Sequence, residues 1–215
     1  SDDMYSLFYK NVVDTAMLTG VNVFFNGTKI PMKTLKDYAS LYVSPIAPIA
    51  QPETVEEKED EKDLDEDDTV SVTSTASKKD KDKEKGRKKQ LDQIHIISDD
   101  SECVLQPNPN ISDGFQAISF VNGIETRDGG VHIDTYAEAI FRPLLEALNK
   151  GVKKGSTPLG LKEIKPYFQM FLKSTLDKPA FNSQEKSKLV SPAPAVPEVA
   201  TKHINAILKW GCVDK

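Results

Sequence analysis

Lysines in two predicted loops are the residues of this 215-residue chain whose type and spacing best suit them for chemistry. Lys150, Lys153 and Lys154 fall between Asn149 and Gly155, directly after a predicted helix. Three ammonium groups at the carboxyl end of a helix can neutralise phosphates, and such binding depends on salt but not on base sequence. Surface lysines are common, however, so composition alone favours an ordinary solvated loop.

A further lysine, Lys186, lies in the stretch Phe181–Lys188, after a predicted strand. A lysine at the tip of a loop can reach a phosphate as a point charge. Composition alone does not favour a contact with phosphate over an ordinary solvated side chain. Both groups of lysines therefore need independent support before a function follows from them.

No catalytic or metal-binding motif is visible in the sequence. It contains no Gly-x-Ser-x-Gly, no Walker loop, no His-Glu-x-x-His and no Cys-x-x-Cys. The three histidines, His95, His132 and His203, are scattered, whereas a zinc site needs three or four converging ligands. We therefore predict no metal site. We interpret His132 as a residue that ties down a turn and His203 as a partly buried packing residue.

Composition narrows the class of protein. Hydrophobic residues make up 38% and charged residues 28% of the chain, a low apolar share that predicts a disordered piece beside an ordered one. Cys103 and Cys212 lie far apart, which excludes a disulfide scaffold and fits a reducing compartment. The longest apolar runs are far short of the roughly 18 residues of a membrane span, and the first residues do not resemble a signal peptide.

The elements that must position the lysines fall into three predicted parts. Residues 1–50 predict a helix over 4–18, a hairpin at Asn26-Gly27 and a short helix over 35–43. Residues 51–92 carry an acidic run, a Ser/Thr stretch and a lysine-rich run. Almost no apolar side chain is present there to offset the ordering cost of roughly 1–2 kcal/mol per residue, so we predict a disordered insertion.

Residues 93–215 predict an α+β domain. We expect strands over 94–97, 116–124 and 167–172, and helices over 132–150 and 197–210. We interpret Asp99, Asp100 and Glu102 as a loop at a strand end. This order of elements predicts a right-handed βαβ crossover on a small mixed sheet.

Two stretches of this domain resemble a known family. Ser119–His132 reads Ser-Phe-Val-Asn-Gly-Ile-Glu-Thr-Arg-Asp-Gly-Gly-Val-His and closely resembles the Ser-Phe-Val-Asn-x-Ile-x-Thr-x-x-Gly-Gly-x-His signature of eukaryotic type IIA DNA topoisomerases. Asp177–Lys186 is similar to the family's Asn-Pro-x-Phe-x-Ser-Gln-Thr-Lys segment. Val21–Val43 is similar to the strand and helix that end the family's ATPase module. The Gly-Gly-Val-His sequence is most similar to that of the family members from large DNA viruses.

The resemblance implies a fragment of an ATP-dependent DNA topoisomerase II, an isomerase. Residues 1–50 would be the C-terminal tail of its GHKL ATPase module, and 93–215 the transducer domain, a ribosomal-protein-like sheet with packed helices. Such a fragment relays ATP binding and hydrolysis to DNA strand passage, while the transient double-strand breaks that relax supercoils are made elsewhere in the enzyme. No catalytic residue is expected in the fragment, so it should be inactive alone; ATP and Mg²⁺ would be bound by the full-length enzyme.

The resemblance also assigns roles to the lysines. In the family, the glutamine and lysine of the Gln-Thr-Lys loop touch the γ-phosphate of ATP, and this role falls on Gln184 and Lys186. Glu185 replaces the family's threonine, and a carboxylate beside a triphosphate is unfavourable unless it points away. The family's lysine-rich loop that contacts transported DNA matches Lys150, Lys153 and Lys154.

The implied partners are double-stranded DNA, the enzyme's own ATPase and DNA-cleavage modules, and a second copy in a homodimer, with no membrane. The implied location is the nucleus or a viral replication site. Two alternatives stay open. One is a non-catalytic βαβ module that binds nucleic acid or protein. The other is a transducer of the gyrase or mismatch-repair type, against which the Ser-Phe-Val-Asn signature argues.

Overall fold

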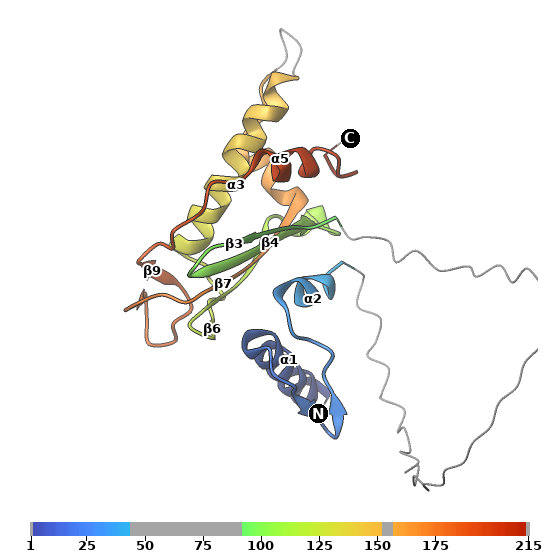
Figure 1. Cartoon of the computed structure of the whole chain (residues 1–215), viewed down its shortest axis with the longest axis vertical. Helices are drawn as coiled ribbons and strands as arrows, with labels where there is room; N and C mark the ends of the chain where they lie inside the picture. The colour runs from blue at the N-terminus through green and yellow to red at the C-terminus, as the bar shows by residue number, and fades with distance from the viewer. Residues whose placement is uncertain (1, 44–91, 152–156, 214–215) are drawn as a thin grey trace, which may run out of the picture. The chain divides into compact units, whose positions relative to one another are not determined.

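The computed structural model describes residues 2–43, 92–151 and 157–213 (Figure 1). All of them belong to one compact unit, formed by Ser1–Ile49 and Leu91–Lys215. The predicted disordered insertion over 51–92 lies outside the described residues except for its last residue, so its state remains a prediction. The predicted boundary between an ATPase tail and a transducer domain likewise remains a prediction.

The N-terminal elements confirm the predicted helix, hairpin and short helix. They are α1 (Asp2–Thr19), β1 (Phe24–Phe25), β2 (Thr28–Lys29) and α2 (Leu35–Ser40). Asn26 and Gly27 both have positive φ, 49° and 80°, which is the backbone that a two-residue hairpin turn requires. Thr34 caps α2, since its side-chain oxygen accepts a hydrogen bond from the Asp37 amide at 3.1 Å.

A five-stranded mixed sheet forms the centre of the remaining domain. Its strands are β3 (Ile94–Ile97), β4 (Ser101–Pro107), β5 (Gln116–Val121), β6 (Ile124–Glu125) and β7 (Phe168–Ser174). The strand order is β3-β4-β7-β5-β6; β5 and β7 run parallel and the other pairs antiparallel. The helix α3 (Val131–Lys150) connects the parallel strands, which confirms the predicted βαβ unit and the α+β class.

The expectation of a loop through Glu102 was wrong. Residues Ser98–Asp100 turn between two strands, but Glu102 lies in β4, which pairs along its length with β7. The sequence pattern did not indicate this strand, because two of its buried residues are polar. Ser101 and Gln106 are satisfied by partners on β7, at 2.9 Å and 3.1 Å, that lie far away in the sequence.

Helices cover both faces of the sheet. Successive side chains of a strand point to opposite faces, and the central strands contribute apolar side chains to the core on each face. One core unites α3, α4 (Leu161–Ile164) and α5 (Thr201–Ile207) with residues such as Phe168 and Met170 of β7. Figure 1 shows α3 and α5 on the same side of the sheet. The second core packs Met17 of α1 and Tyr38 of α2 against Phe171, the residue of β7 that follows Met170 and points to the opposite face.

The C-terminal part differs from expectation in two respects. The last helix, α5, is shorter than the predicted 197–210, and the residues directly before Thr201 form no regular secondary structure. A small hairpin, β8 (Ala180–Phe181) and β9 (Leu189–Ser191), was not predicted. Two 3₁₀ turns, η1 (Ile111–Asp113) and η2 (Lys165–Tyr167), complete the elements. Among the described residues, no helix combines the length and the hydrophobicity that crossing a membrane requires.

Candidate functional site

The loop that carries Gln184 and Lys186 is the turn of the β8–β9 hairpin. Ala180 pairs with Ser191, and Phe181 with Leu189. The neck of the loop is closed by Asn182, whose backbone N–H donates to the Lys188 carbonyl at 3.1 Å and whose side-chain oxygen accepts from the Lys188 N–H at 3.2 Å. The hairpin therefore presents residues 183–187 as a short, closed tip.

Gln184, Glu185 and Lys186 are all exposed at this tip. The Lys186 N–H donates to the Ser183 carbonyl at 3.1 Å, and Lys186 has a φ of 56°. Its ammonium lies 5.8 Å from the centroid of the Phe181 ring, a cation–π distance that leaves the charge open to a ligand. The ammonium of Lys186 is thus not buried, and its contact with a phosphate remains a prediction.

Glu185, which replaces the family's threonine, does not share the surroundings of Lys186. It lines a cleft of about 720 Å³ together with Asn11 and Thr15 of α1 and Arg127. Lys186 does not line this cleft. The two side chains of opposite charge therefore occupy different surroundings at the same tip, although they are adjacent in the sequence.

Three polar side chains of the stretch Ser119–His132 form a buried network next to the Gly129-Gly130 turn, which contacts the hairpin. The Ser119 and Thr126 hydroxyls lie 2.6 Å apart, and the Thr126 hydroxyl lies 3.0 Å from Nε2 of His132. All three residues are buried, and burial lowers the pKa of His132 to about 4. His132 is therefore neutral at pH 7 and fixes the segment before the Gly129-Gly130 turn, which confirms its interpretation as a residue that ties down a turn.

The second candidate group lies at the opposite end of α3. Lys150 is exposed as the last residue of the helix, whereas Lys153 and Lys154 lie outside the described residues. The side chain of Asn149 donates to the Leu159 carbonyl at 3.1 Å and accepts from its N–H at 2.8 Å, which closes the base of this loop. With 20 residues, α3 separates its two ends by about 30 Å. The structure therefore places Lys150 at the end of α3 that lies away from the loop of Lys186.

A polar network that the sequence did not reveal joins α1, α2 and β6. The Lys10 ammonium contacts Asp14 at 2.6 Å and Glu125 at 3.1 Å, and the Tyr38 hydroxyl donates to Asp14 at 2.8 Å. Burial lowers the pKa of Lys10, but the hydrogen bonds and the charges of the two carboxylates outweigh it and raise the pKa overall. Only the i,i+4 spacing of Lys10 and Asp14 was visible in the sequence.

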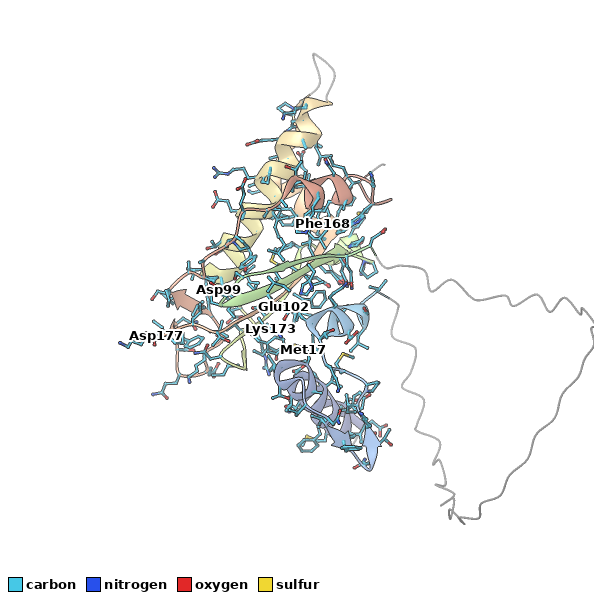
Figure 2. All side chains as sticks on the ribbon, in the orientation of Figure 1. Met17, Asp99, Glu102, Phe168, Lys173 and Asp177 are labelled. Atoms are coloured by element: carbon cyan, nitrogen blue, oxygen red, sulfur yellow. The ribbon has the colours of Figure 1, made fainter. Side chains whose placement is uncertain are left out.

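A second ion-pair cluster lies across the strands β3, β4 and β7. Glu102 contacts His95 at 2.7 Å with one oxygen and Lys173 at 2.7 Å with the other. Figure 2 shows Glu102 and Lys173 side by side. Such cross-strand pairs stabilise a sheet. The described residues hold no group of three or more His, Cys, Asp or Glu side chains that could bind a metal ion.

Comparison with known proteins identifies the family. A family model described as DNA gyrase B matches residues 35–210. The chain belongs to the DNA gyrase B family. DNA topoisomerase 2 of Invertebrate iridescent virus 6 is 33% identical over 220 residues, which cover 100% of this chain and 15% of the viral protein. DNA topoisomerase 2 of Bombyx mori is 28% identical over 218 residues, which cover 99% of this chain and 11% of the insect protein.

Solved structures show the same fold. The ATPase region of Saccharomyces cerevisiae topoisomerase II matches with a TM-score of 0.66 at 21% identity, over 100% of this chain and 44% of the yeast chain. The ATPase and transducer domains of Balamuthia mandrillaris DNA topoisomerase II match with a TM-score of 0.66 at 16% identity, over 96% of this chain and 41% of that chain. The resemblance to type II topoisomerases, a viral enzyme included, is thereby confirmed. The chain spans no more than 15% of the two sequence relatives.

Proposed function

We propose that this chain is the part of an ATP-dependent type II DNA topoisomerase that relays ATP binding and hydrolysis to DNA strand passage. The observation that carries the proposal is the exposed position of Gln184 and Lys186 at the tip of a closed hairpin loop, in a chain of the DNA gyrase B family. The amide of Gln184 and the ammonium of Lys186 supply hydrogen-bond donors, which match the acceptor oxygens of a terminal phosphate.

Contact with the γ-phosphate gives such a loop its function. ATP and ADP then bind differently to the conformation in which the loop is docked, and only a difference of this kind can shift a conformational equilibrium. The ATPase module of the longer enzyme supplies the rest of the nucleotide site. On the resemblance to the family, we assign Mg²⁺ binding to that module as well.

The opposite end of α3 is the proposed DNA contact. Lys150, together with Lys153 and Lys154 of the following segment, would attract a duplex without regard to its sequence. The catalytic residues and the second subunit of the homodimer belong to the full-length enzyme, so the chain alone should hydrolyse no ATP. In that enzyme the chain would work in the nucleus or at a viral replication site.

Replacement of Lys186 tests the proposal. In the full-length enzyme, Lys186→Ala should lower ATP turnover and strand passage about 10- to 100-fold, because a hydrogen bond to a charged group contributes about 1.5–3 kcal/mol. Lys188→Ala is the matched control: Lys188 is exposed in the same loop, but it closes the neck through its backbone. Unchanged turnover in Lys186→Ala, or an equal loss in Lys188→Ala, would refute the role of Lys186.

A further inference from the structure

We propose that Asn122, Gly129 and Gly130 are positioning residues that hold both arms of the loop carrying Lys186. They act as a clamp, with Asn122 on the arm that enters the β8–β9 hairpin and the two glycines on the arm that leaves it. The inference rests on the proposed function, since the position of the tip matters to the reaction only if Lys186 contacts the nucleotide.

Asn122 holds the entering arm. It follows β5 directly, and its side chain makes two hydrogen bonds to the backbone of Leu176: Nδ2 donates to the carbonyl at 2.9 Å, and Oδ1 accepts from the N–H at 2.8 Å. Its φ of 51° is a left-handed conformation that asparagine tolerates better than most residues. In Figure 2, Asp177, the next residue of this arm, lies well away from Phe168 in the helix-covered core.

Backbone contacts hold the leaving arm. The Asp128 N–H donates to the Ser187 carbonyl at 2.9 Å, and the Leu189 N–H donates to the Gly129 carbonyl at 3.0 Å. Gly130 and Leu189 also form a parallel β-bridge. The chain just after Lys186 is therefore fixed to the turn that precedes α3.

Gly130 allows this approach because it has no side chain. A Cβ atom built on Gly130 would lie 2.1 Å from the Leu189 carbonyl oxygen and 2.7 Å from its nitrogen, both backbone atoms. Its φ of 131° is also a conformation that residues with a side chain rarely adopt. Any larger residue must displace the leaving arm, so the glycine sets the distance between the loop and the start of α3.

The tip depends on these two arms for its orientation. Leu176 and Leu189, one from each arm, are buried in a small apolar cluster with Val121. Beyond them, within the described residues, the hydrogen bonds of residues 183–186 go only to one another and to Asn182. Because none of these hydrogen bonds reaches the sheet, the clamp fixes the two arms from which the tip extends, and the Lys186 side chain leaves that tip over the Phe181 ring.

Amide hydrogen exchange of the 215-residue chain tests the clamp without nucleotide. Asn122→Ala should speed exchange at the Leu176, Lys188 and Leu189 amides by at least about tenfold, because local opening no longer breaks the bonds to Leu176. Asn108→Ala is the matched control, since Asn108 is a buried asparagine whose side chain bonds to the backbone elsewhere in the domain. It should leave those amides unchanged. Loop exchange that is the same in both variants would overturn the proposal.

A double-mutant cycle in the full-length enzyme tests whether the clamp acts through Lys186. Asn122→Ala should lower ATP turnover by about tenfold in the wild type and have no further effect in a Lys186→Ala background. Equal effects in both backgrounds would overturn the positioning role. If Lys186→Ala leaves turnover unchanged while the loop amides still loosen in Asn122→Ala, the proposed function fails but the structural clamp stands, so the two failures are distinguishable.

Discussion

Acidification should destabilise this chain through His132. Its side chain is 0% exposed, and among the described residues its Nδ1 has no hydrogen-bond partner. Burial lowers the pKa of this histidine from 6.5 to about 4. In the unfolded chain the same group titrates near its ordinary value, so the unfolded state takes up a proton at a pH where the folded state does not.

The sign and size of the effect follow from this difference. Above pH 6.5 both states are neutral and the contribution of His132 to stability is fully present. As the pH falls toward 4, each unit costs about 1.4 kcal/mol, which amounts to about 2 kcal/mol at pH 5 and about 3 kcal/mol near pH 4. Below pH 4 the folded state is protonated as well, and the loss stops growing.

The assay is urea unfolding of the 215-residue chain, followed by circular dichroism between pH 7.5 and 4. The reference is His132→Gln, whose side-chain amide can still reach the Thr126 hydroxyl but does not titrate. The carboxylates and the other two histidines are common to both chains. Subtracting one unfolding free energy from the other therefore cancels the contributions of these groups to the pH dependence. The wild type should lose stability relative to the variant only below pH 6.5. Parallel pH profiles for the two proteins would refute the argument.

Three further predictions follow from the structure and the sequence. Replacing Lys150, Lys153 and Lys154 with alanine in the full-length enzyme should weaken DNA-stimulated ATP turnover and reduce the slope of log affinity against log salt by about 3; an unaltered slope would count against the DNA contact. Tyr38→Phe removes a hydrogen bond to a buried carboxylate of α1 and should cost about 1.5–3 kcal/mol in urea unfolding, and no loss would show that this network adds no stability. Burial raises the pKa of Cys103, so a thiol reagent should label Cys103 only in the urea-unfolded chain; rapid labelling of the native chain, read by mass spectrometry, would contradict this.

Several elements were predictable because their signals are local. Asn26-Gly27 fixes a hairpin by the backbone freedom of two residues. The apolar spacing within α3 gives a helix that buries one face, and Gln116–Val121 gives a strand by alternation. The exposed loop tip with Lys186 was also foreseen, since its motif is a short run of consecutive residues.

The strand β4 was not predictable, because its burial depends on distant partners. Gln106 is fully buried, yet a glutamine within a strand is usually taken as a sign of exposure. Its amide is satisfied by Gln169 on β7 and by the Ala39 carbonyl of α2. Neither partner can be paired with Gln106 until the sheet has been assembled.

The candidate site likewise combines features that are local in the sequence with features that depend on distant segments. The sequence by itself pointed to the residues that could meet a phosphate only through their resemblance to a family motif, because a lysine in a polar turn is equally consistent with a solvated side chain. Only the tertiary structure decided what holds that tip, since Asn122 and Leu176 are 54 residues apart and Gly130 meets Leu189 across a comparable stretch of chain. Bonds between such distant segments leave no periodic pattern in the sequence, and the absence of a single methyl group at Gly130 acquires its meaning only when a second backbone lies against it.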